Sequence, residues 1–178
     1  MPIASGVSAA HSFADNQMPK TDPLRKQIAQ FIDFGDAHVT ADAAMANLEH
    51  SLQGKRAEGV AHSPWELLEH LRITQHDILD FSINPKYKEM KWPDDYWPKS
   101  PAPPHADSWK KSVAAFRKDR DALRAMAEDP EIDLFAKIPH GDGQTYLREL
   151  LLAQDHLSYH VAQLVIVRRL LGAWPPPK

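Results

Sequence analysis

Two histidines one helical turn apart are the residues whose types and spacing point most directly to chemistry. His156 and His160 lie four positions apart in the segment HLSYH, so a helix would place both imidazoles on one face. Imidazole nitrogen binds divalent metal ions, and both rings could reach a single ion. The spacing alone is weak evidence, because most such pairs are structural. The same helical stripe continues through core-facing positions at Leu152, Gln163 and Val167, which indicates that both histidines are buried.

A third histidine could complete a metal site. His70 projects from its predicted helix beside Leu67, on the flank of an apolar stripe, so its side chain can enter the space between helices. Taken alone, His70 is more often a structural residue than a ligand, and His76 points away from it and is expected to be exposed. Buried imidazoles without partners are costly, however, and a shared cation would remove that cost. His70 is therefore the candidate third ligand beside His156 and His160.

Such a site would leave the ion open to substrate. Three neutral imidazoles leave one or more positions for water or substrate, which is the arrangement of a catalytic site. Bound water with a lowered pKa could attack an ester or amide, or the ion could bind a substrate thiol as the thiolate, and the sequence favours neither.

The chain contains no cysteine, so a metal must be held by nitrogen or oxygen ligands. Zinc, nickel, manganese and iron all accept imidazole, and among them we expect zinc or nickel. We also expect metal affinity to fall below about pH 6.5, where protons compete for imidazole.

Two further residues are weaker candidates for catalysis. Asp77 lies seven residues after His70 and could orient a ligand or act as a base, although an exposed carboxylate is the commoner outcome. Gln163 continues the histidine stripe and could bind substrate, but a structural role in helix packing is slightly favoured. Arg148 and Glu149 could approach an anionic substrate, and ordinary surface charge is the simpler explanation for both.

Helices must position these residues. Apolar spacing with start and stop signals predicts helices over residues 23–36, 41–52, 63–81, 107–129 and 144–171. The stretch 41–52 is alanine-rich and forms either a short helix or a continuation of the first. Ser63, Pro64 and Glu66 have the pattern of a capping box. No stretch alternates with period two, so we predict an all-α fold, a four-helix bundle with long ordered loops. The longest loop contains the aromatic segment from Trp92 to Pro98, which could wall the site or cover the core.

The bulk composition limits the possible partners. A chain of 178 residues with 43% hydrophobic and 25% charged residues fits one globular domain, which we place at residues 21–178 after a mobile tail over residues 1–20. The 21 basic residues are dispersed among 24 acidic ones, which argues against nucleic-acid binding. No apolar run is long enough to span a bilayer, and the first residues do not form a secretory signal. We therefore expect no membrane partner and a cytoplasmic location.

The motifs resemble the DinB/YfiT-like superfamily of metal-binding four-helix bundles over nearly everything after residue 20. The resemblance rests on SPWELLEHL, which contains His70, and on DHLSYHVAQL, which contains His156 and His160. It implies that these three histidines form the metal-binding triad of that family. Ala162 replaces the small residue, often glycine, that precedes the family's glutamine, and this departure leaves the ligands untouched. Three segments also resemble a subgroup with no assigned reaction: WPDDYWP, PHGDGQT and RRLLG.

The resemblance implies a choice of functions. Family members are similar to thiol-dependent transferases and isomerases that use low-molecular-weight thiols such as bacillithiol or mycothiol, or to metal-dependent hydrolases. We therefore expect a metal-dependent S-transferase or hydrolase that acts on a small-molecule substrate. The alternative is a non-catalytic stress-response or interaction protein in which the metal is structural or absent. The family also commonly forms homodimers through helix packing, so we expect a homodimer.

Overall fold

The computed structural model describes residues 22–34 and 37–176, apart from the side chain of residue 34, and this part of the chain is helical. Its elements are α1 (Pro23–Phe34), α2 (Ala41–Met45), α3 (His50–Gln53), α4 (Pro64–Ile83), α5 (Ser108–Glu128) and α6 (Tyr146–Leu170). The described residues contain no strand, only one isolated bridge between Lys137 and Thr145. The prediction of an all-α protein is confirmed, and the predicted tail over residues 1–20 lies outside the described residues. No helix in the described ranges combines the length and apolar character needed to cross a bilayer.

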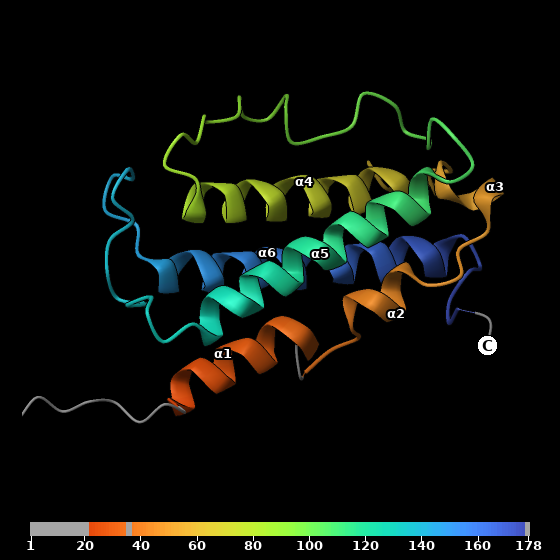
Figure 1. The fold of residues 1–178 in the computed structure, drawn as a ribbon. Helices are drawn as coiled ribbons and strands as arrows, with labels where there is room; N and C mark the ends of the chain where they lie inside the picture. Colours follow the sequence, from red (N-terminus) through yellow and green to blue (C-terminus); the bar gives the residue numbers. More distant parts are fainter. Residues whose placement is uncertain (1–21, 35–36, 177–178) are drawn as a thin grey trace, which may run out of the picture.

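Four long helices determine which residues meet. α4 packs against α5 and α6, and α1 packs against α5 and α6. Figure 1 shows α4 and α6 side by side and running in opposite directions, because the chain runs toward one end of the molecule in α4 and returns from that end in α6. The long connector over residues 84–107 returns above α4 to the start of α5 (Figure 1). The early turns of α4 therefore lie beside the late turns of α6.

Apolar side chains from all four long helices form the core. One cluster, around Leu68, Phe116 and Leu164, lies toward the start of α4, and the other, around Leu79, Leu123 and Leu150, lies toward its end. Burial of these side chains is the main stabilising contribution to the helix packing. The buried apolar side chains of α5 include Trp109, Val113, Phe116, Leu123 and Met126.

The start of α4 is fixed by the predicted capping box. The Ser63 Oγ accepts a hydrogen bond from the Glu66 amide at 3.2 Å, and the Ser63 amide donates to the Glu66 carboxylate at 2.8 Å. The Ser63 hydroxyl also donates to the Pro101 carbonyl at 2.5 Å, and Arg56 pairs with the Glu66 carboxylate. The box therefore sets where α4 begins and ties the connector to that point.

Replacing Ser63 with alanine is expected to destabilise the protein by about 1–2 kcal/mol, because two hydrogen bonds at a buried helix start are lost. Urea unfolding followed by circular dichroism measures this change in the free energy of unfolding. Ser51, exposed on α3, gives the matched control, and Ser51→Ala should stay within about 0.5 kcal/mol of the parent. Equal values for the two variants would contradict the role of the cap.

The stretch 41–52 divides into two short helices instead of one. Asn47 has φ 49°, in the left-handed region, which ends α2 and redirects the chain into α3. Asparagine tolerates this conformation better than most residues, and it cannot continue a right-handed helix there. The alanine-rich composition predicted the helical tendency but not the break.

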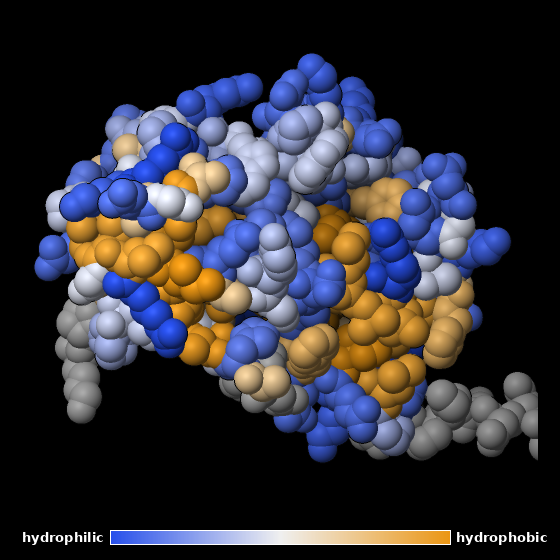
Figure 2. All heavy atoms as spheres, turned by 180° about the vertical axis from the view of Figure 1, so that it is seen from behind, coloured by the Kyte–Doolittle hydropathy of each residue, from blue (hydrophilic) through white to orange (hydrophobic). Residues whose placement is uncertain are grey.

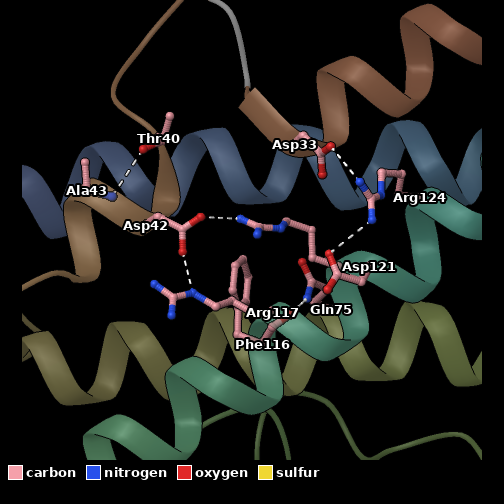
Figure 3. A network of polar contacts seen from close by, with 10 residues as sticks. Asp33, Thr40, Asp42, Ala43, Gln75, Phe116, Arg117, Asp121 and Arg124 are labelled. Atoms are coloured by element: carbon pink, nitrogen blue, oxygen red, sulfur yellow. Dashed lines mark hydrogen bonds and ion pairs between the residues drawn. The ribbon is translucent and has the colours of Figure 1, made fainter.

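Neighbouring helices contact part of the charged face of α5. The Asp42 carboxylate binds Arg117 and Arg120 at 2.6 Å each, and Asp33 binds Arg124 at 3.3 Å (Figure 3). Burial acts to raise the pKa of Asp42, but hydrogen bonds from the two arginines hold that pKa below its usual value. These ion pairs connect α5 to α2 and α1.

Candidate metal centre

The three predicted histidines converge between α4 and α6. His70 comes from the second turn of α4, and His156 and His160 come from the middle of α6. One potential ligand nitrogen from each ring can be chosen so that all three lie within 4.8 Å of one another, and the His156 and His70 Nε2 atoms are 3.0 Å apart. The antiparallel packing of α4 and α6 thus brings together residues 86 positions apart.

Burial differs among the three rings. His70 and His160 are buried, with exposed fractions of 2% and 8%, whereas His156 is half-buried. The expectation that both histidines of α6 are buried therefore holds for His160 alone. The next residue, Leu157, takes the core-facing position, which places His156 at the flank of the helix, where solvent has access.

Hydrogen bonds fix which nitrogen of two rings is free to bind a metal. His70 Nδ1 lies 2.8 Å from the Tyr96 carbonyl, which can only accept, so Nδ1 donates and Nε2 keeps its lone pair in the neutral ring. His160 Nδ1 lies 2.8 Å from the Gln163 side-chain oxygen and donates to it in the same way. Partners of this kind orient metal-binding histidines in proteins. Both Nε2 atoms are thereby left as ligand atoms.

The environment keeps the triad uncharged at neutral pH. Burial, helped by the positive charge that neighbouring histidines can carry, lowers the pKa of His70 to about 4, against the opposing effect of its hydrogen bond to Tyr96, and lowers that of His156 to about 3. Burial also lowers the pKa of His160, against the opposing effect of its hydrogen bond to Gln163. Metal ions bind the neutral imidazole. The rings are therefore in the protonation state that a metal requires.

The nitrogen positions fit a first-row divalent ion. Two imidazole nitrogens on tetrahedral zinc, each at about 2.05 Å, are separated by roughly 3.3 Å. The His70 and His156 Nε2 atoms are 3.0 Å apart, close to that value. Within the described residues, no fourth His, Cys, Asp or Glu belongs to this cluster. The chain thus offers three nitrogen ligands and leaves room for a further one.

The connector supplies one wall of the site. Trp97 stacks on His70 with ring centroids 3.9 Å apart and an interplanar angle of 3°, and it also stacks on His62 at 4.0 Å and 15°. Trp92, in the same aromatic segment, is 68% exposed, and its ring packs against that of Tyr96. The aromatic segment therefore walls the site through Trp97 and through the Tyr96 carbonyl.

His62 is a residue that sequence reasoning missed. It precedes the cap residue Ser63, so it lies outside the helical stripes that identified the triad. Its charge, when present, acts on both His70 and His160 to lower their pKa values. Its place just before a strong helix-start signal was the available clue, since such a residue lies near the first turns of the helix.

Asp77 contacts two tyrosines of the connector. One carboxylate oxygen accepts from the Tyr87 hydroxyl at 2.9 Å, and the other accepts from the Tyr96 hydroxyl at 2.7 Å. Burial and these contacts with Asp77 raise the pKa of both phenols. Asp77 thus holds Tyr96, and the Tyr96 backbone carbonyl in turn orients His70.

Arg148 and Glu149 differ from each other in burial. Arg148 is exposed, as expected for surface charge, but Glu149 is only 2% exposed and pairs with Arg148 at 2.7 Å. The interpretation of Glu149 as a surface residue is therefore wrong. Both residues line a polar pocket of about 400 Å³ that also includes Asp77. This pocket lies between α4 and α6, toward the start of α6.

Replacing Gln163 with leucine is expected to weaken metal binding by about 10–100-fold, because His160 loses the acceptor that orients it. Competition with a chromophoric chelator measures the dissociation constant. Gln163→Glu keeps an oxygen acceptor and should retain most of the affinity, and Gln30→Leu, at an exposed position of α1, should have no effect. Unchanged affinity in Gln163→Leu would show that the contact does not orient the ligand.

Comparison of the chain with protein-family models finds no matching family, and comparison with curated proteins and with solved structures finds no match either. The resemblance to the DinB/YfiT-like superfamily therefore stays a prediction. What the site can do follows from its own residues.

Proposed function

We propose that the chain is a metal-dependent enzyme of the DinB-like four-helix-bundle type, either a thiol-dependent S-transferase or a hydrolase. His70, His156 and His160 would hold the ion, with zinc or nickel as the favoured metal and manganese or iron as alternatives. When bound, the ion would supply Lewis acidity that lowers the pKa of water or of a substrate thiol. Either reaction class uses the same open position.

One observation carries this proposal: three neutral imidazoles converge with no fourth protein ligand in the described cluster. Structural zinc sites normally have four protein ligands, whereas catalytic sites have three. The half-buried position of His156 supports access for a small molecule. The site is therefore better suited to substrate binding than to a purely structural ion.

The surrounding residues have separate roles in this proposal. Trp97 covers one face of His70 and limits the approach of water on that side. Gln163 and the Tyr96 carbonyl orient the ligand rings. Both oxygens of Asp77 accept from tyrosines, so we assign Asp77 to positioning, and not to proton abstraction from substrate.

The test begins with elemental analysis of purified protein and continues with turnover assays. Stoichiometric divalent metal, together with turnover of an ester or of an electrophile plus thiol, is the expected result. Turnover that requires added thiol identifies the transferase, and turnover in water alone identifies the hydrolase. His160→Ala should abolish either activity, and His76→Ala should retain it, because His76 is exposed and pairs with Asp119.

The rival function is a non-catalytic stress-response or interaction protein. Metal-free protein, or metal-loaded protein without turnover of ester or thiol probes, would favour it over an enzyme.

The homodimer also remains a proposal. Exposed apolar side chains on α6, at Leu151, Tyr159, Ile166 and Leu170, support it, and sedimentation velocity measures the mass directly.

A further inference from the structure

An apolar pocket lies next to the histidine triad, in the same groove between α4 and α6. Its volume is about 310 Å³, and it extends from the loop before α4 across to the last turns of α6. Leu67 in its wall is three residues before His70, and Gln163 is three residues after His160. Because side chains three residues apart are neighbours on a helix, the pocket begins where the triad ends.

The pocket is apolar apart from two side chains. Leu67 and Val167 are buried, at 1% and 3% exposed, whereas Ile166 at the rim is 52% exposed. Seen from behind, the molecular surface has two hydrophobic areas separated by a hydrophilic band (Figure 2). An exposed aliphatic side chain beside a hollow of this size leaves apolar surface in water, and a ligand could cover it.

The two polar side chains of the pocket, Gln163 and His62, are connected to the triad. Gln163 accepts the hydrogen bond from His160 at 2.8 Å. His62 stacks on Trp97, which also stacks on His70. The polar groups thus connect the pocket to the metal ligands, and the remaining wall is hydrocarbon. A molecule placed here would have its polar end toward the triad and its apolar end away from it.

The pocket on the other side of the triad has the opposite character. It is lined by charged groups, among them Asp77, Glu89, Arg148 and Glu149. Burying an uncharged hydrocarbon group against charged side chains gains little, and it deprives those charges of water. The difference between the two pockets therefore determines how a substrate would be oriented in the groove, with its apolar substituent on the Leu67 side.

We propose that the apolar pocket is the specificity site for the proposed reaction and binds an uncharged aliphatic or aromatic group of the substrate. The inference rests on the proposed function, since the triad would hold the reacting end. The reacting end is polar and small, and the group that selects the substrate is hydrocarbon. Pockets of this kind, mostly apolar with a few placed polar groups, are typical small-molecule sites.

The test uses n-alkyl hydroxamates, whose head group binds metal ions and whose tail length can be varied. Zinc-loaded protein is titrated calorimetrically with acetohydroxamate, butyrohydroxamate and hexanohydroxamate. The dissociation constant is expected to fall about fourfold for each added methylene until the pocket is filled. A dissociation constant independent of chain length, with acetohydroxamate bound, would overturn the pocket assignment and leave the metal site intact.

Two variants place bulk in the pocket without altering the triad. Ala61 is exposed at the pocket wall, so Ala61→Phe and Ile166→Trp should bind acetohydroxamate as the parent does but lose most of the chain-length dependence. Leu151→Trp, at an exposed position near the other end of α6, is the matched control and should keep it. Full chain-length dependence in both pocket variants contradicts the proposal. A third outcome would assign the surface around the pocket to self-association: the parent shows no chain-length dependence, and the two pocket variants sediment differently from the parent.

A metal-independent measurement separates this inference from the proposed function. Metal-free protein is titrated with 1-hexanol and with ethanol while the methyl resonances of Leu67 and Val167 are followed by nuclear magnetic resonance. Hexanol is expected to shift them saturably and at much lower concentration than ethanol. If acetohydroxamate does not bind the zinc-loaded protein, the proposed function is wrong. If hexanol and ethanol shift the methyl resonances equally at equal concentration, the assignment of the pocket is wrong.

Discussion

Replacing His70 with alanine is expected to abolish stoichiometric metal binding. His70 is the only member of the histidine triad on α4, so its loss leaves His156 and His160 on one helix with no partner across the groove. Loss of a residue that merely orients a ligand costs about 10–100-fold in affinity, and loss of a ligand itself should cost more than roughly 100-fold. Elemental analysis after dialysis, with cobalt titration followed by visible absorption, measures the effect.

His76→Ala is the matched control for this variant. His76 lies on the same helix as His70, but its ring is exposed and pairs with Asp119 on α5. This variant should retain one ion per chain. Far-ultraviolet circular dichroism of both metal-free variants shows whether the fold is kept. A folded His70→Ala protein that still holds one ion at parental affinity would remove His70 from the site.

Acid is expected to destabilise the metal-free protein well above the pH at which its buried histidines titrate. An unfolded chain has histidine pKa values of about 6.5, whereas those of His70 and His156 in the folded protein are about 4 and about 3. Below pH 6.5 the unfolded state therefore binds more protons than the folded state, and the free energy of unfolding falls as pH falls. His70 alone accounts for a loss on the order of 3 kcal/mol between pH 6.5 and 4.

Urea unfolding in the presence of a chelator, repeated at intervals from pH 7.5 to pH 4.5, measures this dependence. The double variant His70→Phe with His156→Gln removes the two groups responsible, so its stability should change much less over the range. His76→Ala should keep the parental slope. A free energy of unfolding that is constant or rises on acidification would contradict the buried, neutral state of these rings.

The same pKa values change the expected pH dependence of metal binding. From the sequence alone, proton competition is expected below about pH 6.5, the usual value for imidazole. Burial lowers the folded-state pKa of His70 and His156 well below that value, so protons compete with the metal in the folded protein only at lower pH.

The parts of the structure that could be predicted from the sequence were predicted from helical spacing and capping signals. Ser63 and Glu66 placed the start of α4 correctly, and the spacing of His156 and His160 placed both on one side of α6. These signals are local, since they depend on residues within one or two turns. The meeting of His70 with the α6 pair is not local, and it followed from the inward-facing stripes and the family resemblance.

The rest of the site comes from contacts that no periodic pattern encodes. The Tyr96 carbonyl and the Trp97 ring reach His70 from an irregular connector, whose path depends on tertiary packing. His62 joins the site through Trp97 and belongs to no helical stripe. The burial of Glu149 similarly depends on how α4 and α6 pack together. Such residues become identifiable only once the helices and their connections are placed.

Through the hydrogen bonds from Tyr96 to Asp77 and from His70 to Tyr96, the connector would become a thermodynamic partner of an ion bound at the triad, although it donates no ligand. Because such coupling is reciprocal, an ion that favours the oriented His70 must also favour the docked connector, and by an equal free energy. Substitutions along the connector could therefore raise or lower metal affinity in graded steps. The three imidazoles would remain unchanged, so the strength of metal retention can evolve separately from the identity of the ligands.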